Sequence, residues 1–92
     1  MFITPITQRR ITKNGRTYSD FRRLGERDAC CKVTDSDGKV RTLSVWWTAG
    51  LRTCVVAQEY VPGGHFGKHV NYAGIPVDVR RSLKEAIRAH IN

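Results

Sequence analysis

A chain of 92 residues with 40% hydrophobic residues can enclose one small core, so we expect a single domain spanning residues 1–92. It has no run near the roughly 18 apolar residues of a membrane-spanning helix, and its short apolar start lacks the charged leader of a signal peptide. Three cysteines, two of them adjacent at Cys30 and Cys31, do not suit a disulfide framework and favour a reducing cytoplasm. The formal net charge of +8 directs attention to anionic partners.

The positive charge is concentrated toward the two ends of the chain. Residues 1–27 carry seven Lys/Arg against two acids, residues 28–62 carry four against four, and residues 63–92 carry five against two. Eleven of the sixteen basic residues are arginine, whose planar guanidinium can bind a phosphate or carboxylate through two hydrogen bonds. Runs of charge often serve only to keep a surface soluble. The clustering and the excess of arginine favour an anionic partner instead.

Residues 9–27 form the most basic segment and are typical of a β-hairpin. The β-branched residues at its start favour a strand over about 6–12. Asn14-Gly15 matches a type I′ turn, because both residues tolerate the positive φ that this turn requires. A returning strand is predicted over 17–23. The hairpin would display a surface that faces phosphate and binds more weakly as salt rises; its candidate contacts are Arg9, Arg10, Lys13, Arg16, Tyr18, Arg22, Arg23 and Arg27.

The second half of this hairpin has an alternative interpretation. Alternation along the returning strand is imperfect, with Tyr18 on one side and Phe21 on the other, and Ser19 could instead cap a short helix within 19–27. Both aromatic residues lie among basic residues, a pattern typical of rings that stack on unpaired bases. In the helical alternative the basic patch has a different shape and remains positively charged.

Strand signals dominate the middle of the chain. Strands are predicted over 29–34 and 39–47, separated by the turn sequence Asp-Ser-Asp-Gly. Trp46 and Trp47 fall on opposite sides of the second strand, so one enters the core and the other packs under a helix or remains partly exposed. Packing is the commoner role of such a pair, and stacking on a base is the alternative. Residues 51–61 are assigned to a strand, although a helix also fits.

The C-terminal part contains the clearest helix. A glycine-rich stretch up to residue 74 predicts a long loop. Pro76 suits the first turn of a helix, and apolar residues then recur at helical spacing: Val79, Leu83, Ala86 and Ile87, followed by His90. A basic outer surface is expected from Arg80, Arg81, Lys84 and Arg88. The expected fold is α+β, a small antiparallel β-sheet of four or five strands with one C-terminal α-helix packed on it.

The motifs present favour neither catalysis nor a metal. The chain has no nucleophile motif, no phosphate-binding loop of Walker spacing and no paired carboxylates. His65 and His69 have the spacing of zinc ligands, and Cys54 or one of Cys30 and Cys31 could complete the set. Against a zinc site, no Cys-x2-Cys pair is present, and Cys30 and Cys31 would point to opposite faces of a strand. We expect a non-enzymatic protein without a metal or other cofactor.

Two terminal stretches carry a resemblance to a known class of protein. The opening MFITPITQRRITKNGRTYSDFRRL and the closing GGHFGKHVNYAGIPVDVRRSLKEAIRAHIN, together with the length, resemble small phage-encoded anti-CRISPR proteins that inhibit type I-F CRISPR surveillance complexes. The resemblance implies a non-enzymatic inhibitor in the host bacterial cytoplasm. Such an inhibitor docks on the RNA-guided complex, contacts its backbone and large Cas subunits and its guide RNA, and prevents target DNA from pairing. Acidic mimicry of DNA, which other members use, is excluded by the sign of the charge.

Together these observations predict that the basic hairpin faces nucleic acid and that an adjacent patch faces protein. The alternative is a small basic nucleic-acid-binding module or regulator that acts on free DNA or RNA. No RNA-recognition, KH, zinc-finger or helix-turn-helix motif selects among DNA, RNA and a ribonucleoprotein. Neither a membrane nor a small-molecule substrate is expected as a partner.

Overall fold

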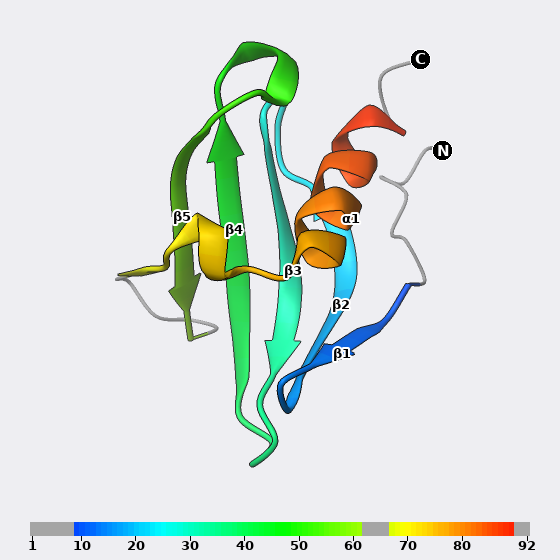
Figure 1. Ribbon diagram of the computed structural model, residues 1–92, viewed down its shortest axis with the longest axis vertical. Helices are drawn as coiled ribbons and strands as arrows, with labels where there is room; N and C mark the ends of the chain where they lie inside the picture. The colour runs from blue at the N-terminus through cyan, green and yellow to red at the C-terminus, as the bar shows by residue number, and fades with distance from the viewer. Residues whose placement is uncertain (1–8, 62–66, 90–92) are drawn as a thin grey trace.

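The computed structural model describes residues 9–61 and 67–89, and within them six strands form one antiparallel sheet with a single α-helix packed on it (Figure 1). The order of strands in the sheet follows the chain, so each strand pairs with its neighbours in sequence. The strands are β1 (Ile11–Lys13), β2 (Arg16–Arg23), β3 (Asp28–Thr34), β4 (Val40–Trp47), β5 (Cys54–Tyr60) and β6 (Lys68–His69). The expected α+β class with one C-terminal helix is confirmed, with more strands than the four or five expected.

The helix, α1 (Val77–Arg88), covers one face of the sheet over β2 and β3. Pro76 precedes its first turn, where its fixed φ suits a helix start and Asp78 complements the helix dipole. The described part of the predicted apolar stripe is buried: Val79, Leu83 and Ile87 are all 0% exposed, and His90 lies outside the described residues. Burying a side chain of this size stabilises the fold by about 1.5–3 kcal/mol. The stripe therefore holds α1 on the sheet and turns the opposite, basic side outward.

The core between α1 and the sheet follows the alternation of β3 and β4. Ala29, Cys31 and Val33 of β3 face α1, and Leu43, Val45 and Trp47 of β4 continue this layer. Trp47 is 0% exposed, and its indole Nε1 donates a hydrogen bond to the Tyr72 hydroxyl at 3.0 Å. Trp46 points to the other face and is 49% exposed. The prediction that one tryptophan enters the core and the other lies opposite is confirmed.

A β-bulge in β2 explains why its alternation was imperfect. The pairing with β3 shifts between Ser19 and Arg22, and Asp20 within the bulge has a φ of 56°. The extra residue shifts the alternation of the side chains that follow it by one position. Tyr18 and Phe21 therefore both enter the core, 5% and 0% exposed, although simple alternation placed them on opposite sides. The strand prediction over 17–23 is confirmed, and the alternative of a helix within 19–27 is wrong.

The remaining connections refine the sequence-based boundaries. Residues 51–61 contain the predicted strand as β5, after a short 3₁₀ turn η1 (Ala49–Leu51). In the stretch expected to be one long loop, β6 and a second 3₁₀ turn, η2 (Tyr72–Gly74), are present. The first strand was expected over about 6–12; residues 6–8 lie outside the described part, and β1 begins at Ile11. Asn14 and Gly15 form the β1–β2 turn with φ of 53° and 77°, as expected for a type I′ turn.

The buried cysteine of β3 is expected to lower the stability of the fold at alkaline pH. Cys31 is 1% exposed, and this burial, with a smaller effect of Cys30, raises the pKa of its thiol. An unfolded cysteine ionises at about pH 8.5, so above that pH the folded state binds a proton that the unfolded state has lost. We expect this thiol to lower the free energy of unfolding by about 1.4 kcal/mol for each pH unit above about pH 9. Urea unfolding at several values of pH measures the effect.

The control for this prediction is the Cys31→Ala variant. Because alanine loses packing, the free energy of unfolding of Cys31→Ala should lie below that of the wild type at neutral pH. The gap should narrow as pH rises, because only the wild type carries the thiol that resists ionisation in the fold. A gap that stays constant between about pH 8 and pH 10 would show that Cys31 does not contribute to the alkaline loss of stability.

Candidate nucleic-acid interface

The residues expected to form the hairpin interface do not share one surface. Arg10 and Lys13 are exposed beside β1, and Arg27 is exposed in the β2–β3 loop. Arg22 projects from the face of the sheet opposite α1, whereas Arg23 is half-buried and its Nε donates to the Gly25 carbonyl at 2.7 Å. The bulge between Ser19 and Arg22 moves Arg22 to that face, and ordinary alternation then turns Arg23 the other way. The hairpin itself is formed, but its basic side chains lie on different sides of the fold, and their contact with nucleic acid stays a prediction.

Two of the residues expected to contact nucleic acid, Tyr18 and Arg9, make their contacts inside the fold. Tyr18 is 5% exposed in the core, so its ring is not presented for stacking on a base, and the same holds for Phe21. Arg9 turns toward α1, where its Nη1 donates to Ser82 Oγ at 3.1 Å and lies 3.7 Å from Glu85 Oε2. Arg9 thus ties the segment before β1 to the helix and shares its charge with an acid.

Arg16 belongs to a cluster of alternating charges near the β1–β2 and β3–β4 turns. Its Nε lies 3.2 Å from Asp35 Oδ1, and its Nη1 donates to Glu59 Oε2 at 3.0 Å. Arg41 also pairs with Asp35. Two arginines face two carboxylates, so the cluster carries no net charge. Its role is to hold strands β2, β4 and β5 to the β3–β4 turn, and it adds little attraction for an anion.

Replacing Arg16 by alanine should therefore affect stability and leave nucleic-acid binding unchanged. The Glu59 side chain is 11% exposed and would lose its partner inside the fold. We expect the free energy of unfolding to fall by about 1–3 kcal/mol, measured by urea denaturation. Lys13→Ala is the matched control, because Lys13 is exposed in the same hairpin and should change stability by no more than about 0.5 kcal/mol. Equal stability of the two variants would contradict the structural role of the cluster.

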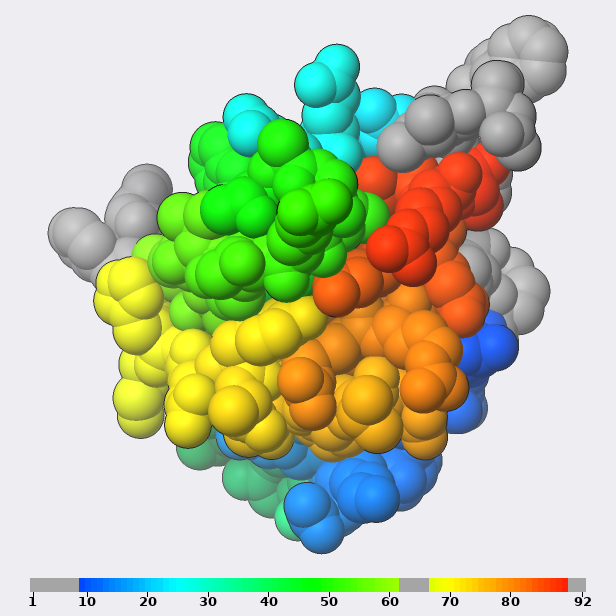
Figure 2. All heavy atoms as spheres, turned by 45° about the horizontal axis from the view of Figure 1, so that its top comes forward, coloured from blue at the N-terminus to red at the C-terminus, as the bar shows by residue number. Residues whose placement is uncertain are grey.

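The outer side of α1 carries the basic groove that the hairpin lacks. A groove of about 270 Å³ is lined by residues of η2 and α1, which we call the α1 groove: Tyr72, Val77, Arg80, Arg81, Lys84 and Arg88. In Figure 2 the helix lies on the surface beside the segment that contains η2. Of its bases, Arg81 lies 3.7 Å from Asp78 in an exposed pair. Among the described residues, no carboxylate lies within 4.0 Å of the nitrogens of Arg80, Lys84 or Arg88.

Neighbouring groups hold two of these cations in place. Arg80 Nε donates to the Ile75 carbonyl at 2.9 Å, and its guanidinium carbon lies 5.2 Å from the centre of the Tyr72 ring. Lys84 Nζ lies 5.9 Å from the centre of the Trp47 ring. Cation–π contacts of this kind order a side chain and leave its other donors free. The groove therefore presents positive charge that needs little reorganisation before it meets a partner.

The spacing of these cations suits a row of phosphates. Arg80, Lys84 and Arg88 are separated by four residues each, which places them one above the other along one side of the helix at intervals of about 6 Å. This interval is comparable to the distance between successive phosphates of a nucleic-acid strand. A half-buried aromatic ring, Tyr72, lies at the side of the row. The α1 groove can thus follow the backbone of one strand.

Basic residues at one end of the molecule extend this surface. The β2–β3 loop, the β4–β5 connection and the last turn of α1 meet there (Figures 1 and 2), and the Trp47 amide donates to the Arg27 carbonyl at 2.8 Å. Segments 9–10, 23–27, 48–53 and 77–88 together carry nine basic residues against three acids, and the rest of the chain carries seven against five. Most of the net charge therefore belongs to α1 and the segments around its ends.

The other chemical groups considered from the sequence do not converge in the described part of the chain. Within residues 9–61 and 67–89, no three His, Cys, Asp or Glu side chains are placed to hold a metal ion. His65, the first member of the suspected zinc pair, lies outside these residues. In the same part of the chain, no helix is long and apolar enough to cross a membrane.

Comparisons with family models, curated proteins and solved structures found no match to this chain. The assignment of the candidate site therefore rests on the geometry of this fold alone. The sequence had shown that Arg80, Arg81, Lys84 and Arg88 lie outside the apolar stripe of α1. It had not shown that Tyr72 and Val77 complete a groove with them, because η2 meets the helix only after the chain has folded.

Proposed function

We propose that the protein is a non-enzymatic inhibitor that binds a CRISPR–Cas ribonucleoprotein surveillance complex and blocks pairing with target DNA. The observation that carries the proposal is the α1 groove, in which cations without carboxylate partners among the described residues lie at phosphate spacing beside an aromatic ring. The resemblance of the terminal stretches to phage-encoded anti-CRISPR proteins of type I-F supports the choice of target. In this proposal the basic surface on nucleic acid is centred on α1 and no longer on the β1–β2 hairpin.

The α1 groove would act by occupying the path that the nucleic-acid backbone follows in the surveillance complex. In RNA-guided recognition, pairing starts in a short seed and then extends, so a protein that covers the guide or the DNA path stops recognition without cutting any bond. Arg80, Lys84 and Arg88 would contact phosphates of the guide RNA or of the channel that receives DNA. Further contacts to the backbone and large Cas subunits would determine which complex is bound. The action needs no cofactor and would take place in the bacterial cytoplasm of the host.

A second function is favoured by the same groove. Phosphate contacts carry little sequence information and require no protein partner, so the α1 groove could also bind free DNA or RNA. The protein would then be a small basic nucleic-acid-binding module or regulator. The two functions differ in what the protein binds at physiological salt, because binding through phosphate contacts alone weakens steeply as salt rises.

A binding comparison tests the proposal. Purified type I-F surveillance complex, the same guide RNA alone, and single-stranded DNA are each titrated with the protein at about 0.15 M salt. The proposal expects tight binding to the complex, weak binding to either free strand, and loss of target-DNA binding by the complex once the protein is added. Tight binding to the free strands with no retention on the complex would instead support the free nucleic-acid module.

A further inference from the structure

The face of the sheet opposite α1 is not covered by any described element, and it presents one half-exposed tryptophan, Trp46, among mostly polar side chains. Strand pairing arranges its side chains in rows across the sheet. One row contains Asp28, Trp46 and Val56, and a second contains Arg22, Cys30, Ser44 and Gln58. We call this surface the open face. Figure 1 shows α1 on the other side of the same strands.

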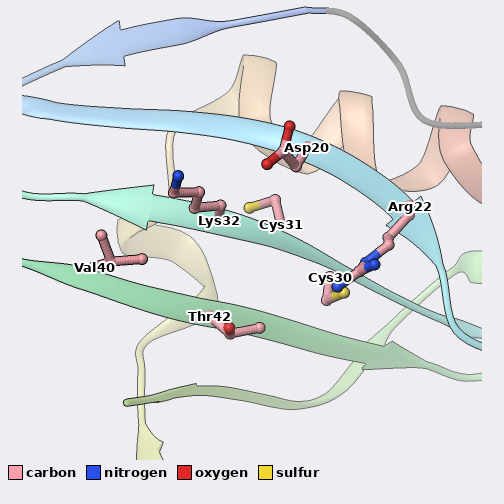
Figure 3. A pocket seen from close by; sticks show the side chains of 7 residues that line it. All are labelled: Asp20, Arg22, Cys30, Cys31, Lys32, Val40 and Thr42. Atoms are coloured by element: carbon pink, nitrogen blue, oxygen red, sulfur yellow. The ribbon is translucent and has the colours of Figure 1, made fainter. Parts of the chain in front are cut away.

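Charge on the open face is balanced, in contrast to the groove side. Arg22, Lys32 and Asp20 line the same depression (Figure 3), and Asp28 stands beside Trp46 in the register. Two cations against two carboxylates give no net attraction for a polyanion. In a protein with a charge of +8, a neutral face of this size is a poor surface for nucleic acid and a good one for an uncharged protein surface.

Trp46 is the prominent group on this face. Its side chain is 49% exposed, and its partner in the register of β4 and β5 is Val56. The pairing shifts between Trp46 and Trp47, and Val55, at this irregularity, is 62% exposed. Val40, 37% exposed, borders the depression at the other end of β4. Tryptophan is the residue most enriched among those that dominate binding energy in protein interfaces, where it fills a pocket on the partner. Single exposed valines are ordinary, so the half-exposed indole is the feature of this neutral face that a partner would engage.

The neighbouring depression gives the face a shape that a partner can match. It has a volume of about 400 Å³ and is lined by side chains of β2, β3 and β4: Asp20, Arg22, Cys30, Cys31, Lys32, Val40 and Thr42. In Figure 3 the Arg22 side chain points toward Cys30, and Lys32 and Asp20 project from β3 and β2. Cys30 is 3% exposed, so the floor is closed and apolar. The face thus combines a projecting ring with an adjacent hollow.

We propose that the open face docks on a protein subunit, with Trp46 inserted into an apolar pocket of an uncharged surface. The inference rests on the proposed function, since it assigns the protein contacts of the inhibitor to one side of the sheet and the nucleic-acid contacts to the other. The partner that fits is a protein surface without net charge at its centre, with a projecting side chain that enters the hollow beside Thr42. Arg22 and Lys32 would then form the polar rim of the interface.

The test measures binding of Trp46→Ala to the purified surveillance complex. Loss of a central tryptophan should weaken binding by about thirtyfold or more, with an unchanged dependence on salt, because no charge has been removed. Leu24→Ala is the matched control, since Leu24 is 51% exposed in the β2–β3 loop, and its binding should stay within about twofold. Val40→Lys gives a second variant at an exposed position that should weaken binding without opening the core. Circular dichroism verifies that each variant is folded.

The same experiment contains the results that would overturn the proposal. A photo-crosslinking amino acid placed at position 46 should join the protein to a Cas subunit; a crosslink to RNA, or an equal loss of binding to free RNA in Trp46→Ala, would assign the ring to base stacking. Sedimentation that shows a dimer of the wild type and a monomer of Trp46→Ala would assign the face to a second copy of this chain. If the wild type binds the complex and Trp46→Ala binds equally well, only this inference fails. If the wild type does not bind the complex, the proposed function itself fails.

Discussion

Replacing Arg80, Lys84 and Arg88 together by glutamate is expected to lower affinity for the surveillance complex by about a hundredfold or more at about 0.15 M salt. Each replacement removes a cation that has no carboxylate partner among the described residues and places a negative charge where a phosphate would lie. The slope of affinity against salt should also fall, by about one for each phosphate that the protein no longer binds. Titration of labelled protein at several salt concentrations measures both quantities.

The control keeps the net charge equal and moves the changes elsewhere. Lys13, Lys39 and Lys68 are exposed on other parts of the molecule, and changing all three to glutamate alters the charge by the same amount. This variant should lose far less affinity, since it acts only through the general field of the protein. If both triple variants lose affinity to the same degree, the α1 groove has no special role. Replacing Arg80, Lys84 and Arg88 by glutamine should give an intermediate loss, because it removes attraction without adding repulsion.

Trp47→Ala is expected to have the largest effect on stability. The side chain is 0% exposed, packs in the core, and donates a hydrogen bond to Tyr72 at 3.0 Å. Truncating a buried tryptophan costs about 3–5 kcal/mol, a large share of the roughly 5–15 kcal/mol that holds a typical domain folded. In so small a core we expect a substantially unfolded population at about 37 °C. Circular dichroism during urea and thermal unfolding gives the measurement.

The adjacent tryptophan supplies the control. Trp46 lies on the open face and is 49% exposed, so Trp46→Ala should change the free energy of unfolding by about 1 kcal/mol or less. Trp47→Phe keeps a ring in the core and loses the hydrogen bond, and Tyr72→Phe loses the same bond from the other side. Each variant should lose about 0.5–1.5 kcal/mol from the bond itself, and Trp47→Phe should cost more than Tyr72→Phe because it also loses packing. Equal destabilisation by Trp46→Ala and Trp47→Ala would contradict the assignment of the two faces.

The effect of Trp47 also reaches the α1 groove. Trp47 contacts Tyr72 through the hydrogen bond and an edge-to-face arrangement with ring centres 6.1 Å apart, and Tyr72 in turn lies under Arg80. Lys84 lies over the Trp47 ring itself. The core residue thus positions two cations on the outside of the helix. Variants that loosen the Trp47 ring should weaken both binding and stability. Variants at the open face, such as Trp46→Ala, should weaken binding and leave stability nearly unchanged.

Local sequence patterns determined the elements of this protein. Alternation along β3 and β4 assigned the core residues and separated Trp46 from Trp47, because neighbouring side chains of a strand point to opposite faces. The apolar spacing from Val79 to Ile87 assigned α1 and its basic side for an equally local reason. The Asn14-Gly15 turn was likewise readable, since few residues tolerate its backbone conformation.

Only the tertiary structure decided which charges are presented together on one surface. The bulge at Asp20 moved Tyr18 and Phe21 together into the core, and no pattern within β2 shows where such an extra residue falls. The ion pair between Arg16 and Glu59 joins residues 43 positions apart, so the sequence counted a charge that the fold neutralises. The α1 groove and the open face depend on the register of distant strands and on the packing of η2 against the helix. The sequence determined the sign and amount of charge, and the long-range contacts determined the surface on which it is presented.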